Sequence, residues 1–132
     1  MVDSHFTVTT KVRVSVKEIT DLLCCGLEGG IHHWAGFRSG YNPEPEELAQ
    51  YTEGCYKGLP VYALEHPNYV LIIQDSNTMV EYQITLDRLK LGLTDLAAKF
   101  QHHFSNVMQG NCDAETGDAF IQCCVFGDII YG

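Results

Sequence analysis

The chain has 132 residues, of which 45% are hydrophobic and 19% are charged. This length fits one domain, and the apolar fraction suffices for a core, which excludes a disordered or collagen-like chain. Seventeen acidic residues against eight Lys and Arg give a formal net charge of −9. Such a charge repels phosphate backbones and anionic lipid, so neither direct nucleic-acid binding nor a membrane partner is expected.

The N-terminal part predicts a strand followed by a helix. Even positions from 6 to 16 are largely apolar and odd positions are polar, which is the period of a half-buried strand. Ser15 and Glu18 have the spacing of a capping box, and apolar residues at helical spacing lead to Gly29-Gly30, where the helix is expected to end. A short strand over residues 31–35 is expected next.

A long loop is expected over residues 36–58, which are rich in Gly, Pro, Asn and Tyr, with one short helix near residues 44–51. A connection of this length in a small domain typically carries a binding site or an oligomer contact. Residues 61–64 then read as a further strand. Residues 69–74 and 79–85 predict a hairpin around a four-residue polar turn.

The last third of the chain predicts helices. One is expected over residues 86–91, ending near Gly92, and a longer one begins at Thr94 and closes before Gly110. A last helix, from Asp113 to Gly127, is apolar nearly all round, so it is expected to be buried in the fold or in an oligomer.

Residues 128–132 either add an edge strand or dock as a tail. Together these elements predict one α+β domain over residues 1–132. Its antiparallel sheet is expected to have four to five strands, with three to four helices packed on one face.

Six cysteines in a short chain raise the question of disulfides, but their spacing does not match a disulfide framework. They form two adjacent pairs in predicted helices and two isolated positions: Cys24-Cys25, Cys123-Cys124, Cys55 and Cys112. The first five residues lack the basic and apolar stretches of a secretion signal. We therefore expect reduced, mostly buried thiols and a cytoplasmic protein.

The densest group of unusual residues follows the first predicted helix. Two glycines there permit close approach by a ligand, Trp34 offers a stacking surface, and Glu28 can accept hydrogen bonds. Further along, Arg38 can oppose a phosphate, and Tyr41 and Tyr82 can add stacking. The predicted ligand-binding residues are Glu28, Gly30, His32, His33, Trp34, Arg38, Tyr41 and Tyr82. The alternative is a helix end followed by a strand whose Trp34 enters the core.

Catalysis has weaker support. The histidines and cysteines show no CxxC or HExxH spacing, so no metal and no cofactor are expected. Cys25, His33 and Glu28 could form a nucleophile system, but Cys25 lies on a helix flank, and the chain has no nucleophile elbow or phosphate loop. A protein without enzymatic activity is the favoured interpretation.

Three parts of the chain carry a resemblance. They are DLLCCGLEGGIHHW at residues 21–34, Gly92-Leu93 together with KFQHHF at 99–104, and DAETGDAFIQCCVFGDIIYG at 113–132. They resemble segments of small accessory proteins encoded by bacteriophages and prophages, which carry an LEGG-x-NYW-like run and a C-terminal DAxTxDxFxQCxxFGxIxYG-like run. His32-His33 departs from that pattern, in which Asn-Tyr precedes the Trp.

The resemblance implies a setting, the cytoplasm of a bacterial host, and an anti-defence role of phage type. One route is to bind and sequester a small nucleotide-like immune signal without catalysis. The alternative is an acidic protein–protein inhibitor of a bacterial defence nuclease, such as a CRISPR or restriction complex. The long loop and the apolar last helix favour a homo-oligomer with sites between subunits, so sequestration is preferred.

Overall fold

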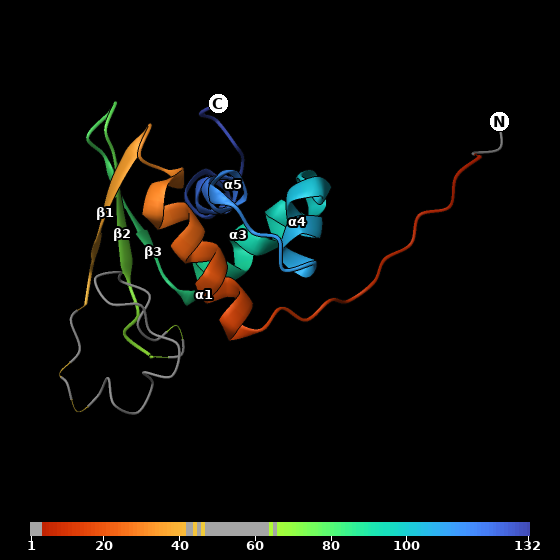
Figure 1. Ribbon diagram of the computed structural model, residues 1–132, viewed down its shortest axis with the longest axis horizontal. Helices are drawn as coiled ribbons and strands as arrows, with labels where there is room; N and C mark the ends of the chain where they lie inside the picture. Colours follow the sequence, from red (N-terminus) through yellow and green to blue (C-terminus); the bar gives the residue numbers. More distant parts are fainter. Residues whose placement is uncertain (1–3, 42–43, 45, 47–63, 65) are drawn as a thin grey trace.

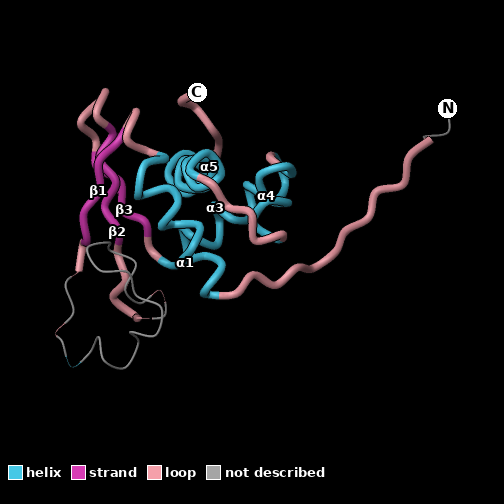
Figure 2. The backbone as a smooth tube through the Cα atoms, in the orientation of Figure 1, coloured by secondary structure: helices cyan, strands magenta, loops and turns pink. Residues whose placement is uncertain are grey.

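The computed structural model describes residues 4–41, 44, 46, 64 and 66–132. In this part of the chain, four α-helices pack on one face of a three-stranded antiparallel sheet (Figures 1 and 2). The predicted α+β class, with helices on one face, is confirmed. The sheet has fewer strands than the four to five that were predicted.

The first helix, α1 (Val16–Cys25), begins where the capping-box spacing predicts. Ser15 has an extended backbone, and its Oγ accepts a hydrogen bond from the N–H of Glu18 at 3.1 Å, which satisfies one of the unpaired donors of the first turn. The helix continues as a π-helical turn, η1 (Gly26–Gly30), and ends at the double glycine, as predicted.

The sheet consists of β1 (Ala35–Ser39), β2 (Leu71–Asp75) and β3 (Glu81–Ile84), in that spatial order. The hairpin of β2 and β3 is confirmed. Its turn depends on Asp75, whose Oδ1 accepts a hydrogen bond from the N–H of Asn77 at 2.8 Å, an interaction typical of Asp at a turn.

Two of the predicted strands are wrong. Residues 6–15 form no strand of the described chain; instead they extend away from the body (Figure 1), with Phe6 98% exposed. Residues 31–34 form a turn, in which the N–H groups of Trp34 and Ala35 donate to the carbonyl of Ile31 at 2.9 and 2.8 Å. The glycines therefore lead into one more helical turn before the strand begins at Ala35.

The long loop does not begin at residue 36, because β1 continues to Ser39. The predicted helix near residues 44–51 and most of the predicted strand at 61–64 lie outside the described residues.

The C-terminal helices are α3 (Leu86–Lys99), α4 (Gln101–Met108) and α5 (Ala114–Phe126). The predicted break at Gly92 is wrong, because α3 runs through it. Thr94 does not start a helix either: its Oγ1 donates back to the carbonyl of Lys90 at 2.9 Å. The break lies at Phe100, whose φ of −130° and ψ of 64° leave the helical region.

Helix α5 has the predicted bounds. The Asp113 carboxylate accepts a hydrogen bond from the N–H of Thr116 at 2.8 Å, and Gly127 ends the helix in the left-handed region at φ 74°. The helix packs against α1, η1 and α3. Nine of its 13 residues are buried, so its apolar surface is covered within the fold: Thr116, Gly117, Ala119, Phe120, Ile121, Gln122, Cys123, Cys124 and Val125.

Glycines let the neighbouring elements approach α5 at backbone distance. A Cβ added at Gly117 would lie closer than 3.0 Å to the backbone of Gly26, and one at Gly26 would meet Gly117 in the same way. A Cβ at Gly92 of α3 would similarly meet Cys124 of α5. Because both partners of the first crossing are backbone, no side chain can rotate away to make room.

We predict that Gly117→Ala destabilises the protein by about 2 kcal/mol or more, because the overlap with η1 outweighs the ~1 kcal/mol that Ala gains in helix propensity. Gly36→Ala is the matched control, since nothing lies within 4 Å of its added Cβ, and it should change stability by less than about 0.5 kcal/mol. Urea unfolding monitored by circular dichroism measures both. Equal midpoints for the two variants would show that the crossing tolerates a methyl group.

Candidate functional site

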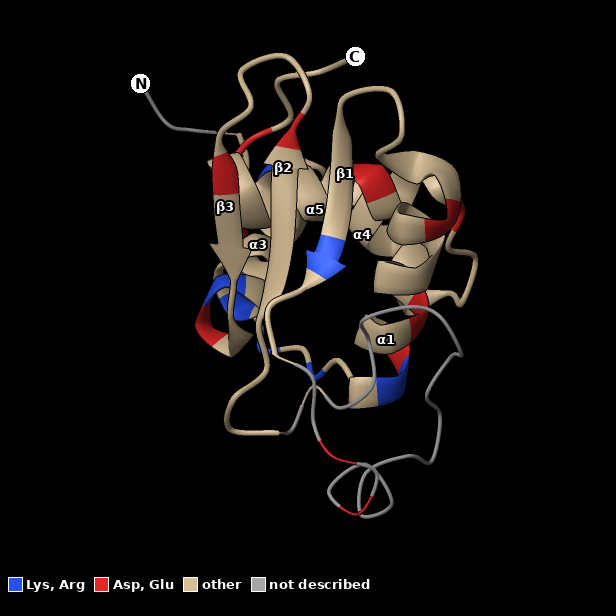
Figure 3. Ribbon diagram, turned by 90° about the vertical axis from the view of Figure 1, so that its left-hand side faces the viewer, with Lys and Arg blue, Asp and Glu red and all other residues tan. Residues whose placement is uncertain are grey.

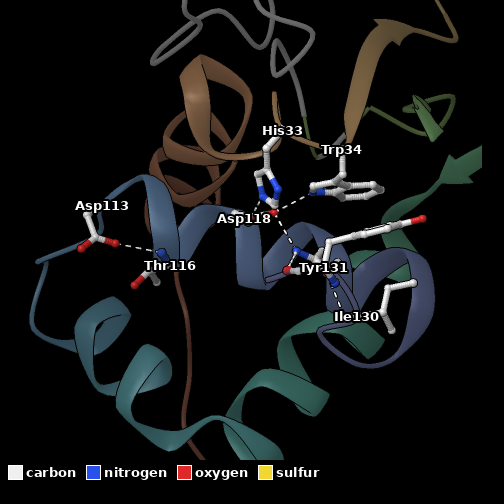
Figure 4. Close-up of polar contacts among 8 residues, drawn as sticks. His33, Trp34, Asp113, Thr116, Asp118, Ile130 and Tyr131 are labelled. Atoms are coloured by element: carbon white, nitrogen blue, oxygen red, sulfur yellow. Dashed lines mark hydrogen bonds and ion pairs between the residues drawn. The ribbon is translucent and has the colours of Figure 1, made fainter. Parts of the chain in front are cut away.

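Trp34 is a core residue. Its side chain is 0% exposed, and its ring stacks on Tyr131 with centroids 5.4 Å apart and lies 5.5 Å from the ring of Phe126. The indole Nε1 donates a hydrogen bond to Asp118 at 2.8 Å (Figure 4). The predicted stacking of Trp34 on a ligand is therefore corrected in favour of the alternative, in which the indole enters the core.

Asp118 of α5 joins the glycine turn to the last helix. Besides Trp34, its carboxylate accepts a hydrogen bond from Nε2 of Gln122 at 3.0 Å and lies 2.7 Å from Nε2 of His33 (Figure 4). The Asp118 side chain is 14% exposed, whereas that of His33 is 43% exposed. The carboxylate therefore accepts hydrogen bonds from two buried N–H groups on its inner side and faces a histidine at the surface.

Gln122 holds the C-terminal tail, which docks rather than adding a strand. Its Oε1 accepts hydrogen bonds from the N–H groups of Ile130 and Tyr131, both at 2.9 Å, and its Nε2 donates to the Tyr131 carbonyl at 3.0 Å. The Tyr131 hydroxyl then donates to Asp75 at 2.6 Å, which ties the tail to the hairpin turn. A fully buried amide thus has its polar groups satisfied by the tail backbone and by Asp118.

Asp75 is 1% exposed, yet it is held in its charged form. Burial alone would raise the pKa of its carboxyl group, but the hydrogen bonds from Tyr131 and from the N–H groups of Asn77 and Thr78 outweigh burial and lower it below the ordinary value. These bonds make the charged carboxylate part of the tertiary structure.

The second segment of the resemblance, which includes KFQHHF at 99–104, also meets α5. Nδ1 of His103 lies 3.0 Å from Oγ1 of Thr116, to which Nδ2 of Asn106 also donates at 3.2 Å. Burial, and then the neighbouring His102, lower the pKa of His103, so this histidine is neutral at pH 7. All the segments that carry the resemblance are thus linked by packing around one helix.

The other predicted site residues lie in separate places. Glu28 and His32 are exposed on η1 and the following turn, and Gly30 packs against the carbonyl of Ala114. Two others belong to the sheet, Arg38 on its outer face and Tyr82 on its inner face.

On the outer face, Nη2 of Arg38 donates to both carboxylate oxygens of Glu81, at 3.0 and 2.9 Å. Strand β2 lies between the two strands that carry these residues, as Figure 3 shows. On the inner face, the half-buried ring of Tyr82 packs edge-on against Phe126 with centroids 5.4 Å apart. The structure therefore does not bring the eight predicted residues together.

Tyr41, another of the predicted residues, lines a cavity at one end of the sheet. This sheet-end cavity, with a volume of about 590 Å³, lies where β1 ends and β2 and α3 begin. Its lining residues are Gly40, Tyr41, His66, Pro67, Asn68, Tyr69, Val70, Thr85, Leu86 and Asp87. The ring of Tyr41 lies 5.0 Å from that of His66, whose Nδ1 accepts a hydrogen bond from the N–H of Asn68 at 3.0 Å.

Sequence reasoning missed His66, Asn68, Thr85 and Asp87. Their spacing in the chain matches no motif, because two separate segments supply them and a third carries Tyr41. The one signal was the long connection, in which Tyr41 lies.

The thiols show no sign of activation. Burial raises the pKa of Cys24 to about 12 and that of Cys112 to about 11. Cys25 donates from its Sγ to the carbonyl of Cys112 at 3.6 Å, and burial raises its pKa as well. The five cysteines among the described residues are free thiols, three of them buried. Since the thiolate is the nucleophile, none of these groups is poised for attack.

Comparison with known proteins found no matching family model, no matching curated protein and no matching solved structure. In the described ranges, no three His, Cys, Asp or Glu side chains gather as a metal-binding group. No helix in the part of the chain that the structure describes has the length and apolar character needed to cross a membrane.

We predict that Asp118→Ala lowers the free energy of unfolding by about 2–4 kcal/mol, because the N–H groups of Trp34 and Gln122 lose their acceptor. Glu115→Ala, on the exposed first turn of the same helix, is the control and should cost about 1 kcal/mol or less. Chemical denaturation with tryptophan fluorescence reports on both, and fluorescence also follows the environment of Trp34. Equal costs for the two variants would mean that the Asp118 contacts are energetically neutral.

We predict that Tyr131→Phe destabilises the protein by about 1.5–3 kcal/mol at pH 7, because a bond to a charged carboxylate is lost. The folded-state pKa of Asp75 is lowered, so its contribution is fully present above the unfolded-state pKa and is lost as pH falls through the folded-state value. The difference between the wild type and Tyr131→Phe should therefore narrow below about pH 4. Denaturation curves between pH 2.5 and 7 measure this, and a constant difference contradicts it.

Proposed function

We propose that this chain is a non-catalytic binding protein that sequesters a small nucleotide-like molecule in the sheet-end cavity. The observation that carries the proposal is the cavity itself, whose volume of about 590 Å³ lies within the ~300–1,000 Å³ range of small-molecule sites. Its lining combines aromatic rings with amide, hydroxyl and carboxylate groups.

The lining residues favour the base and sugar of such a ligand over its phosphates. Tyr41 and His66 place two rings beside each other, on which a base can stack. The Asn68 amide and the Thr85 hydroxyl can pair with polar edges of a base or with sugar hydroxyls. Asp87, in contrast, opposes a phosphate at the start of α3. We therefore expect affinity to come mainly from the nucleoside part.

The resemblance to phage-encoded accessory proteins supplies the setting of the proposal. In this reading, the chain acts in the cytoplasm of a bacterial host and lowers the free concentration of an immune signal. Sequestration needs tight, reversible binding and no turnover. That requirement fits a chain in which burial raises the pKa of the Cys24, Cys25 and Cys112 thiols, all of them outside the cavity lining.

We predict that Tyr41→Ala lowers the affinity for such a ligand by about tenfold or more, since stacking contributes about 1–3 kcal/mol per base. Isothermal titration calorimetry against nucleosides, cyclic oligonucleotides and ADP-ribose derivatives measures this. Met108→Ala, on the exposed surface of α4, is the control and should bind as the wild type does. The absence of heat with every compound would reject the proposal. Chromatography of the mixture after long incubation should recover the ligand unchanged.

A protein–protein inhibitor is the second candidate, and the net charge of −9 favours it. An acidic surface can occlude the basic nucleic-acid channel of a defence nuclease. A size-exclusion column separates the two functions. A stable complex with a CRISPR or restriction nuclease, together with no heat from any nucleotide, would assign inhibition instead of sequestration.

A further inference from the structure

The N-terminal arm, residues 4–15, has the alternating sequence pattern of a strand but pairs with no strand of the described sheet. Phe6, Val8, Val12 and Val14 alternate with polar residues, yet Phe6 is 98% and Val8 is 83% exposed. The arm leaves the body at the start of α1 and points away from the sheet (Figure 1). Val14, at the root of the arm, is partly buried against the core, but the apolar face farther along has no such surface to cover it.

The sheet, in turn, has an edge that fits such a strand. Strand β3 is the outer strand on one side of the described sheet, so one row of its backbone groups has no partner strand there. Its residues alternate as the arm requires: Tyr82 and Ile84 face the helices, while Glu81 and Gln83 are exposed on the outer face. If the arm pairs there, its apolar residues extend the face that packs on the helices and its polar residues extend the outer face.

Charge selects β3 over β1, the other outer strand. If the apolar residues of the arm face the helices, Lys11 and Arg13 lie on the outer face. Next to β3 they meet the carboxylate of Glu81, whose side chain is 46% exposed although Arg38 already bonds to it. Next to β1 they would meet the guanidinium of Arg38 itself. Opposite charges on neighbouring strands stabilise the pairing, and like charges destabilise it.

An apolar groove marks where a second copy would enter. The groove has a volume of about 350 Å³ and lies between the root of the arm and α3. Val12, Val14 and Val16 line one part of it, and Leu86 and Leu89, which follow β3 in the chain, line another. Val12 and Val14 belong to the arm itself, so on exchange the same residues of the partner's arm take their places against Leu86 and Leu89. Twelve extended residues span about 40 Å, so the partner's arm can continue from there along the edge of β3.

We propose that two copies of this chain exchange their N-terminal arms, so that residues 4–15 of one copy add a strand to the β3 edge of the other. The exchange buries the apolar face of both arms, closes both grooves and gives each sheet a fourth strand. It is independent of the sheet-end cavity, so it can hold or fail separately from the proposed ligand.

Sedimentation equilibrium of the full chain tests the exchange. We expect a dimer, and Lys11→Gln with Arg13→Gln should raise its dissociation constant about fivefold or more. Glu81→Gln should weaken the dimer as well, but it should have little further effect in the Lys11→Gln, Arg13→Gln background. Lys17→Gln is the control, because Lys17 pairs within α1 with Asp21 at 2.9 Å. A monomer at 100 µM, or a dimer that none of these variants affects, overturns the proposal.

A disulfide trap locates the arm. With Thr9→Cys and Gln83→Cys in one chain, oxidation should give a covalent dimer on a non-reducing gel, whereas each single variant should not. A covalent link within one monomer would show that the arm pairs with its own sheet. That result contradicts exchange between copies. So does the absence of any link, provided that cysteine at position 7 or 11 in place of 9 gives no link either.

Discussion

The structure depends on the close approach of backbone to backbone around α5. This helix is buried along most of its surface, and two other elements reach it at three glycines: η1 at Gly26 and Gly30, and α3 at Gly92. Where backbones approach this closely, packing is gained without side-chain atoms, and the relative position of the elements is fixed within a narrow range. The turn that carries Trp34 is positioned by this crossing.

The polar network follows from the same crossing. Because η1 lies directly on α5, the indole of Trp34 reaches Asp118, and the same helix presents Gln122 to the C-terminal tail. Tyr131 then bonds to Asp75 of the hairpin turn, so the two layers of the fold are joined by a continuous set of hydrogen bonds. A buried network of this kind specifies one arrangement, since each of its donors and acceptors is costly to leave unpaired.

This arrangement gives the most unusual motif of the sequence a structural role. The run from Glu28 to Trp34 has the composition of a ligand site, but its glycines accommodate a helix and its indole fills the core. The sheet-end cavity, which is the candidate ligand site, lies at the other end of β1, where Tyr41 meets residues from two further segments. The scaffold and the candidate site are therefore separate, so the cavity can be altered with little effect on the α5 network.

The sequence by itself determined the elements that local chemistry controls. Ser15 and Asp113 start helices because their side chains pair with first-turn N–H groups, Gly127 ends one in the left-handed region, and Asp75 builds the hairpin turn. Only the tertiary structure decided the rest. Gly92 is a helix breaker by propensity, but the packing of α3 on Cys124 outweighs that cost, and the alternating arm forms no strand because no strand of the described sheet pairs with it. Whether Trp34 faces a ligand or the core was likewise decided by a contact 84 residues away along the chain, with Asp118, which periodicity cannot reveal.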